Sequence, residues 1–262
     1  MADHLAASLA DSDGVISAAL LVIGDEILSG RTKDKNIGYI AEYLTTIGID
    51  LKEVRVVPDE EPEIITALIA LRGRDTYVFT TGGIGPTHDD ITADCVAKAF
   101  GVPIDYHPEV VEMMKKRVAE TGGVMNEARM RMTRVPAGAT LVLNKISAAP
   151  GFWIGNVIVM AGVPNIMQAM LDYVAPKLKT GAKMLSDTVR ADCREGDIGT
   201  QLGEIAKKHP DVIIGSYPFM DERGGNTNVV VRSRDAHKLT AAMSAVQVML
   251  TRVRAELAAG QG

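Results

Sequence analysis

Short aliphatic runs alternate with stretches of helical spacing along most of this chain, and this alternation restricts its fold more than any other feature. The run Ala18 to Ile23 is followed by residues 35–47, in which Ile40 and Leu44 recur on one helix face. Strand-like and helical stretches then take turns as far as Gly101, and two helices, three strands and a helix are expected after it, at residues 108–120, 126–132, 140–143, 151–154, 157–161 and 164–177. This order is typical of a parallel sheet with helices on both faces, so we expect an α/β fold.

The order of elements changes after Gly181, which we interpret as a hinge between two domains. A strand, a helix, two strands and a long helix are expected at residues 184–190, 198–208, 212–217, 227–233 and 236–257. This β-α-β-β-α order suggests a small α+β domain with a split βαβ arrangement. We therefore predict a flexible N-terminal tail at residues 1–16, an α/β domain at 17–180 and a small domain at 181–262.

Charge and aromatic content argue against a protein that binds nucleic acid. The chain has 28 basic and 33 acidic residues, a formal net charge of −5 and only 4% aromatic residues. It therefore lacks a global positive field that would attract a polyanion, and it has few rings on which bases could stack. Every apolar run is shorter than the roughly 18 residues of a membrane-spanning helix.

The two cysteines, Cys95 and Cys193, lie far apart and form no CxxC pattern. This usage favours a reducing compartment, and Cys95 is expected on the packed side of a helix. We expect a cytoplasmic protein, with no nucleic acid and no membrane among its partners. The sequence leaves open whether the chain forms a homo-oligomer.

The segment Thr81 to Thr92 is the most informative stretch for function. Gly82, Gly83 and Gly85 follow an expected strand, and a helix is expected from Thr92 to Phe100. Glycines let the backbone approach a ligand without a Cβ atom, and the first turn of a helix offers unpaired N–H groups to an anion. This layout predicts a phosphate-binding loop. The alternative is that the glycines serve only the geometry of a turn.

Acidic residues follow these glycines and also end the two preceding strands. Asp89 and Asp90 come after the glycines, whereas Asp25 with Glu26 and Asp59 lie at the strand ends. Because the carboxyl ends of parallel strands line one crevice, Asp25, Asp59 and Asp90 are expected to converge. Carboxylates repel phosphates, so a divalent cation is expected to bridge them, or one acid acts as a base. The alternatives are helix capping for one of the paired aspartates and for Asp59, and a solvated turn for Asp25 and Glu26.

Two further turns of small residues and proline offer backbone N–H groups to a ligand. One contains Asn144, Pro150 and Gly151, and the other contains Gly162. Ordinary turns are the alternative, and for each turn taken singly this is the favoured interpretation. Among the histidines, His88 alone lies in a candidate loop.

Four motifs of the chain resemble the competence/damage-inducible protein A (CinA) family. They are Gly24-Asp25-Glu26-Ile27-Leu28-Ser29-Gly30, the segment 82–92, Asn144 with residues 149–152, and Gly162-Val163-Pro164. The likeness covers nearly the whole chain from Ser17 and concerns the N-terminal, molybdopterin-binding-like part of that family. The same part is similar to the N-terminal half of eukaryotic FAD synthase.

The resemblance implies a three-layer α/β/α fold with a mostly parallel sheet, like that of molybdopterin adenylyltransferases, followed by a small KH-like module. It implies that the acid of the glycine motif and the acid of the Pro-Asp-Glu turn are functional, and these match Asp90 and Asp59. It also implies metal-dependent hydrolysis of ADP-ribose to AMP and ribose 5-phosphate, or hydrolysis of FAD.

We therefore expect a metal-dependent nucleotide pyrophosphatase in which Asp59 and Asp90 are catalytic. The expected ligands of the divalent cation (Mg²⁺, Mn²⁺ or Co²⁺) are Asp89, Asp90 and Asp59. The expected substrate contacts are Gly24, Asp25, Glu26, Gly82, Gly83, Gly85, Pro86, Thr87, Asn144, Pro150, Gly151 and Gly162. Two alternatives stay open: binding of molybdopterin or transfer of AMP to it, and a binding module without enzymatic activity. The expected partner is thus a small-molecule nucleotide or pterin.

Overall fold

A computed structural model describes residues 15–222 and 224–259 of the chain. The chain divides into two compact units, which we call unit 1 (residues 15–181) and unit 2 (residues 182–259). Most of the tail expected at residues 1–16 lies outside the described residues, and the first strand already begins at Ile16. Each unit has its own core, so each is described by itself.

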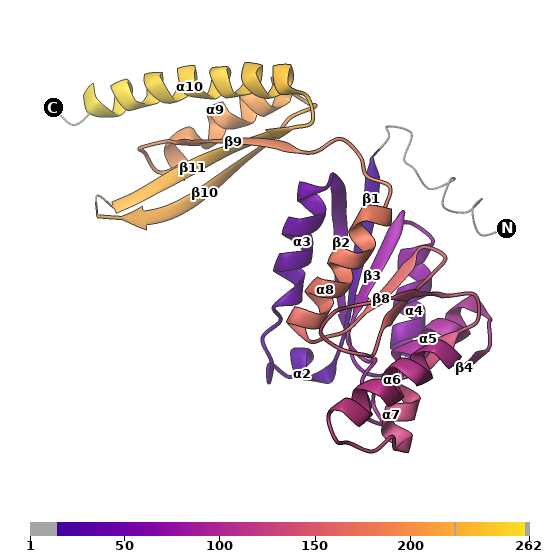
Figure 1. Cartoon of the computed structure of the whole chain (residues 1–262). Coiled ribbons are helices and arrows are strands. Elements are labelled where there is room, and N and C mark those ends of the chain that lie inside the picture. Colours follow the sequence, from indigo (N-terminus) through magenta and orange to yellow (C-terminus); the bar gives the residue numbers. More distant parts are fainter. Residues whose placement is uncertain (1–14, 223, 260–262) are drawn as a thin grey trace. The chain divides into compact units, whose positions relative to one another are not determined.

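The first part of unit 1 alternates strands and helices as the hydrophobic spacing predicts (Figure 1). It comprises β1 (Ile16–Ile23), α2 (Asp25–Leu28), α3 (Asn36–Thr46), β2 (Ile49–Val57), α4 (Glu61–Arg72), β3 (Tyr77–Thr81) and α5 (Thr92–Phe100). Gly101 ends α5 in the left-handed region at φ 65°, where a glycine costs least.

The second part of unit 1 closes the sheet. It comprises β4 (Ile104–Tyr106), α6 (Pro108–Glu120), α7 (Glu127–Arg131), β5 (Arg134–Pro136), β6 (Thr140–Val142), β7 (Gly151–Ile154), β8 (Val157–Met160), α8 (Pro164–Val174) and the 3₁₀ turn η1 (Ala175–Lys177). The six-stranded sheet has the order β2-β1-β3-β8-β7-β6. Strands β2, β1, β3 and β8 are parallel, and β7 pairs antiparallel with β8 and β6.

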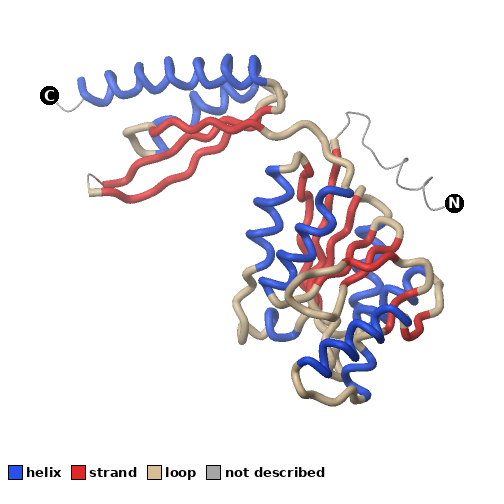
Figure 2. Tube along the Cα trace, viewed as in Figure 1, coloured by secondary structure: helices blue, strands red, loops and turns tan. Residues whose placement is uncertain are grey.

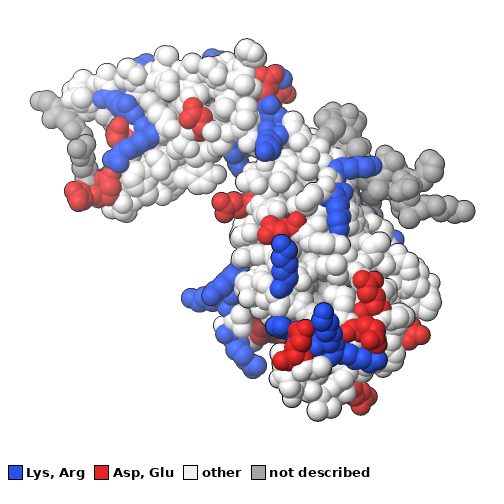
Figure 3. Space-filling view, in the orientation of Figure 1, with Lys and Arg blue, Asp and Glu red and all other residues white. Residues whose placement is uncertain are grey.

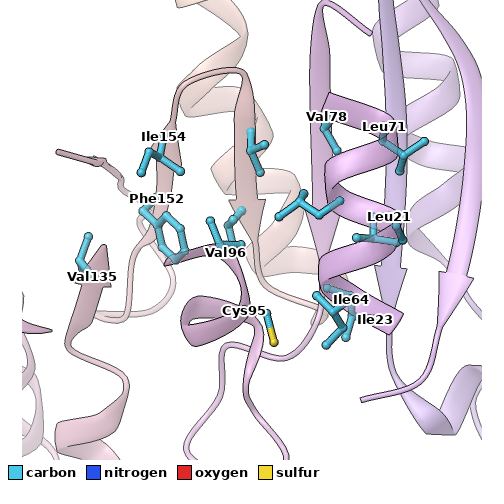
Figure 4. Close-up of a cluster of buried hydrophobic side chains, with 14 of the residues drawn as sticks. Leu21, Ile23, Ile64, Leu71, Val78, Cys95, Val96, Val135, Phe152 and Ile154 are labelled. Atoms are coloured by element: carbon cyan, nitrogen blue, oxygen red, sulfur yellow. The ribbon is translucent and has the colours of Figure 1, made fainter. Parts of the chain in front are cut away.

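Helices cover both faces of this sheet, which confirms the expected three-layer α/β fold. Leu21 and Ile23 of β1 pack with residues of α4 and α5, whereas Leu20 and Val22 pack with residues of α3 and α8. Figure 4 shows the first of these clusters, with Leu21, Ile23 and Phe152 among its labelled side chains. The alternation of β1 side chains therefore divides the core into two halves.

Unit 2 is built from three strands and two helices (Figure 2). They are β9 (Leu185–Arg190), α9 (Glu195–Lys208), β10 (Ile213–Asp221), β11 (Gly224–Ser233) and α10 (Ala236–Ala259). The sheet order is β10-β11-β9, and both outer strands pair antiparallel with β11. Strands β9 and β10 are thus joined through α9 but separated by β11, which is a split βαβ arrangement.

Several short elements were not anticipated from the sequence. Helix α2 is a single turn where we expected a loop, and β4 and β5 are three-residue strands that pair with each other. Helix α9 begins at Glu195, three residues before the expected start, because the Arg194 N–H donates to the Asp197 carboxylate at 3.0 Å. The short elements α2, β4 and β5 carry too few apolar residues to show a period.

Candidate functional site

The ends of β1 and β2 bring two of the expected acids together. The backbone N–H of Asp25 donates to Oδ2 of Asp59 at 2.9 Å, although the residues are 34 positions apart. The Gly24 N–H donates to the carbonyl oxygen of Val57 at 3.1 Å, which holds the two strand ends in register. The expected convergence of Asp25 and Asp59 is therefore confirmed. It follows from the parallel pairing of β1 and β2.

Asp59 lies in an unfavourable environment for its charge. Burial raises the pKa of its carboxyl group, and the negative charges of Asp25, Glu26 and Asp89 raise it further, although the hydrogen bond from Asp25 acts in the opposite direction. The alternative that Asp59 caps α4 is not what we find, because the N-cap residue is Glu60. We call Asp25, Glu26, Asp59 and Asp89 the acidic cluster.

The glycine segment (residues 82–90) closes onto the start of α5. The Thr92 N–H donates to the Gly83 carbonyl at 3.0 Å, and the Thr92 hydroxyl donates to the Gly82 carbonyl at 3.1 Å. Gly82 adopts φ 100°, and a Cβ atom there would lie 2.1 Å from the carbonyl oxygen of Ile23. A Cβ atom on Gly83 would lie 2.1 Å from Oγ1 of Thr92. These glycines are thus required for close packing within the protein, and their contact with a ligand stays a prediction.

The remainder of the glycine segment is braced by Asp90. Its Oδ2 accepts hydrogen bonds from the Thr87 N–H at 2.8 Å and from the Thr87 hydroxyl. A Cβ atom on Gly85 would lie 2.7 Å from the same oxygen. Asp89 and His88 project outward: the His88 side chain is 96% exposed, and its Nδ1 lies 4.0 Å from Oδ1 of Asp89. The acid of this segment whose charge acts on Asp59 is Asp89, while convergence of Asp90 with Asp59 stays a prediction.

A cavity of about 210 Å³ opens where β1, β3 and β8 end and α3 begins; we call it the strand-end cavity. Glu26 of the acidic cluster lines it, as do the expected contacts Gly82 and Gly162. Its full lining is Val22, Ile23, Glu26, Ile27, Thr32, Lys33, Asp34, Lys35, Asn36, Thr81, Gly82, Gly162 and Pro164. Asn36 and Thr81 were not expected as site residues, because only the tertiary structure shows that both line this cavity.

A second, small cavity of about 20 Å³ also borders the glycine segment. It is lined by Gly83, Gly85 and Asp90, together with Pro150 from the turn before β7. Arg131 and Arg134 also line this cavity, and Arg134 donates to both carboxylate oxygens of Asp94 at 3.0 and 2.6 Å. These expected residues are therefore divided between two cavities that border the segment.

The turn that contains Asn144 is held by its own side chain. Oδ1 of Asn144 accepts from the Ile146 and Ser147 N–H groups, and Nδ2 donates to the Ala149 carbonyl at 3.0 Å. Gly151 is buried, and a Cβ atom on it would lie 2.1 Å from the Val159 carbonyl oxygen. The interpretation of this turn as an ordinary structural turn accounts for both residues, and their contact with a ligand stays a prediction.

Three of the described cavities are larger than the strand-end cavity and have none of the acidic cluster in their linings; the smallest of them, of about 280 Å³, is lined by Glu195 and Phe219 among others. The other two are larger still. One, of about 530 Å³, is lined by His107, Trp153 and Tyr173, and the other, of about 550 Å³, lies between α9 and α10. Each has a single carboxylate in its lining, Glu109 and Glu204 respectively. We assign the candidate site to the strand-end cavity despite its smaller size, because it borders both the acidic cluster and the glycine segment.

Within the described ranges 15–222 and 224–259, no three His, Cys, Asp or Glu side chains are arranged to hold a metal ion by themselves. Mg²⁺ is commonly held by one or two carboxylates together with substrate phosphates, which needs no such cage. The oxygen-rich acidic cluster suits a hard divalent cation in this manner. The expected metal ligands therefore stay a prediction.

Cys95 belongs to the core, as expected. It is fully buried in the cluster of Figure 4 beside Val96, and burial raises the pKa of its thiol to about 12. Such a thiol stays protonated near neutral pH and is a poor nucleophile.

Surface charge on unit 1 is mixed. Figure 3 shows basic and acidic side chains interspersed over the visible face of this unit. Among the helices of the described residues, none combines the length and the apolar character needed to cross a bilayer.

Comparisons with known proteins match both units. A family model described as a probable molybdopterin binding domain matches residues 19–180, and one described as the middle domain of FAD synthase matches residues 183–256. A protein of Archaeoglobus fulgidus is 32% identical over 231 residues, which cover 88% of this chain and 96% of the relative. A probable FAD synthase of Caenorhabditis elegans is 28% identical over 258 residues, which cover 89% of this chain and 50% of that protein.

The fold has a solved counterpart. The crystal structure of the protein CinA from Thermoplasma acidophilum superposes with a TM-score of 0.57 at 31% identity, over 62% of this chain and 96% of that one. The KH-like character expected for unit 2 stays a prediction beside its match to the FAD synthase middle domain. Since the first family model spans more than half of the residues, the chain belongs to the family of probable molybdopterin binding domains.

Proposed function

We propose that unit 1 hydrolyses the pyrophosphate bond of a nucleotide such as ADP-ribose or FAD, with AMP as one product. The observation that carries this proposal is the acidic cluster, in which burial and then the charges of Asp25, Glu26 and Asp89 raise the pKa of Asp59. The glycine segment and the strand-end cavity border this cluster. The similarity to CinA and to a probable FAD synthase supports a nucleotide-related ligand.

A divalent cation would relieve the mutual repulsion of the carboxylates in the acidic cluster. We propose that Asp89 and Asp90 hold this cation together with the phosphate oxygens of the substrate. When bound, the cation supplies neutralisation of the phosphate charge and polarisation of the phosphorus. Four carboxylates beside a diphosphate would otherwise oppose substrate binding.

Asp59 is the proposed general base. A raised pKa gives its carboxylate a higher proton affinity than that of an ordinary aspartate, and the Asp25 N–H fixes its orientation. The oxygen of a water molecule bonds to one phosphorus, the bond from that phosphorus to the bridging oxygen breaks, and one water proton passes to Asp59. ADP-ribose would thus yield AMP and ribose 5-phosphate.

Chromatographic detection of AMP tests this proposal. The purified chain is incubated with ADP-ribose, FAD or NAD, with and without Mg²⁺, Mn²⁺ or Co²⁺, and then with a chelator. We expect AMP from at least one substrate and its loss on chelation. Asp90→Asn keeps an acceptor for the Thr87 hydrogen bonds but removes the charge, so it separates bracing of the loop from a charge role. AMP release that survives both chelation and Asp90→Asn would contradict the mechanism.

Pterin binding is the second candidate, and the family match of residues 19–180 favours it. In that case the same cavity and glycine segment would hold molybdopterin, and AMP would be transferred rather than released. A thermal-shift titration distinguishes the two. Stabilisation by molybdopterin but not by ADP-ribose, with no AMP released, would favour the pterin.

A further inference from the structure

Two residues that line the strand-end cavity, Asn36 and Thr81, each carry a buried side-chain oxygen atom without a hydrogen-bond partner in the described part of the chain; we call these two residues the floor of the cavity. Asn36 is 4% exposed and Thr81 is 1% exposed. Among the described residues, neither Oδ1 of Asn36 nor Oγ1 of Thr81 has a hydrogen-bond partner. Buried polar atoms without partners are uncommon in folded proteins, and each needs an explanation.

The chemical group of each oxygen determines whether it can accept or donate a hydrogen bond. Nδ2 of Asn36 donates to the Gly162 carbonyl at 2.8 Å, so the other amide atom is the oxygen and can only accept. The Thr81 hydroxyl can accept or donate. A matching ligand must therefore present at least one O–H or N–H donor to the floor, and a ligand with two such donors would match both oxygens.

The position of the floor indicates which part of a nucleotide reaches it. Thr81 directly precedes Gly82, so a group on the floor lies next to the proposed seat of the diphosphate. In a nucleoside diphosphate the group bonded to the phosphate is the ribose. A volume of about 210 Å³ suits a pentose, and Val22, Ile27 and Pro164 provide apolar walls for its C–H surface.

We propose that Asn36 and Thr81 read the vicinal hydroxyl groups of a ribose attached to the diphosphate, and so select ribose over deoxyribose ligands. This inference rests on the proposed function for the placement of the diphosphate. It names two specificity-determining residues outside the acidic cluster.

Strand β3 offers a matched pair of variants. Thr80 and Thr81 are both buried, and both have a hydroxyl without a described partner. Successive side chains of a strand point to opposite faces, and of the two only Thr81 lines the strand-end cavity. Thr81→Val and Thr80→Val remove the same atom without breaking a described hydrogen bond, so both proteins should fold with a Tm at or above that of the parent.

Calorimetric titration with the Asp59→Asn variant of the 262-residue chain measures binding without turnover. The probes are ADP-ribose and two analogues that lack the 2-hydroxyl of either ribose. We expect Thr81→Val to weaken ADP-ribose binding about tenfold and Thr80→Val to change it less than about twofold. One analogue lacks the hydroxyl that is proposed to contact Thr81. Thr81→Val and Thr80→Val should bind this analogue equally well.

The outcomes separate the ribose inference from the proposed hydrolysis. Equal binding of ADP-ribose by both threonine variants, or equal binding of ADP-ribose and both analogues by the parent, would contradict the ribose inference even if AMP release is found. Hydroxyl-dependent binding without AMP release would support the inference and contradict hydrolysis. Absence of binding by every probe would contradict both.

Discussion

An acid within β2 and an acid just past the end of this strand have opposite environments. Glu53, within the strand, accepts hydrogen bonds from Arg55 and Arg74, and these partners lower its pKa. Asp59, just past the strand end, is partly buried and has acids as its charged neighbours, and burial together with these charges raises its pKa. Glu53 therefore has arginines as its charged partners, whereas Asp59 has further acids. This contrast is the signature expected of a functional site, where stability is given up for reactivity.

The largest expected effect is on catalysis. Asp59→Asn should reduce AMP release about 10²–10⁴-fold, because it removes the proposed base, and should raise Tm at pH 7, because it removes a repelled charge. Glu53→Gln is the matched control: it should leave AMP release unchanged and lower Tm. Chromatography and thermal unfolding provide the two readouts. If both variants lost activity to the same degree, the contrast between the two acids would have no functional meaning.

The next effect concerns the glycine segment beside Asp59. Gly82→Ala should cost roughly 3 kcal/mol of unfolding free energy, because overpacking against the Ile23 carbonyl adds to the strain of φ 100°. Gly30→Ala also places alanine at a positive φ, 70°, but with no atom within 4 Å of its Cβ. It should cost only about 1 kcal/mol. Urea unfolding compares them, and equal losses would show that packing does not set the conformation of the segment.

The smallest effect is a pH dependence of opposite sign for the two acids. A raised pKa means that Asp59 contributes stability at low pH and loses it as pH rises through its folded-state pKa. A lowered pKa means that Glu53 contributes stability at neutral pH and loses it as pH falls through its folded-state pKa.

These signs predict two curves of Tm difference from the parent. The gain of Asp59→Asn should shrink on acidification below the folded-state pKa of Asp59, and the loss of Glu53→Gln should shrink on acidification below the ordinary pKa of glutamate. Thermal unfolding of the parent and both variants between pH 3 and 8 gives the curves. A gain of Asp59→Asn that does not depend on pH would indicate a packing effect rather than a charge effect.

Elements with strong periodicity could be predicted from the sequence. The spacing of Ile40 and Leu44 predicts α3, and the parallel order of strands correctly predicts that Asp25 and Asp59 meet. Helix α2 is too short to show a period. The predictions of α3 and of the contact between Asp25 and Asp59 depend only on residue spacing along the chain and on the rule that parallel strands end at one edge of a sheet.

The finer features of the site depend on tertiary contacts that no local pattern encodes. The unmatched oxygen of Asn36 arises only because Nδ2 reaches Gly162, 126 residues away in sequence. Whether Asp89 or Asp90 faces Asp59 depends on the conformation of the glycine segment, in which Thr87 engages Asp90. The glycines themselves suggested space for a ligand, whereas the atoms of Ile23 and Thr92 occupy the space where their Cβ atoms would lie.

A crystal structure of the Asp59→Asn chain with ADP-ribose and Mn²⁺ tests the central claim most directly. The anomalous signal of manganese locates the cation independently of the ligand. We predict the cation beside Asp89 and Asp90, the diphosphate at the glycine segment and a ribose in the strand-end cavity. Manganese and ligand located elsewhere, such as in the cavity beside Trp153 or between α9 and α10, would contradict the assignment of the acidic cluster as the catalytic site.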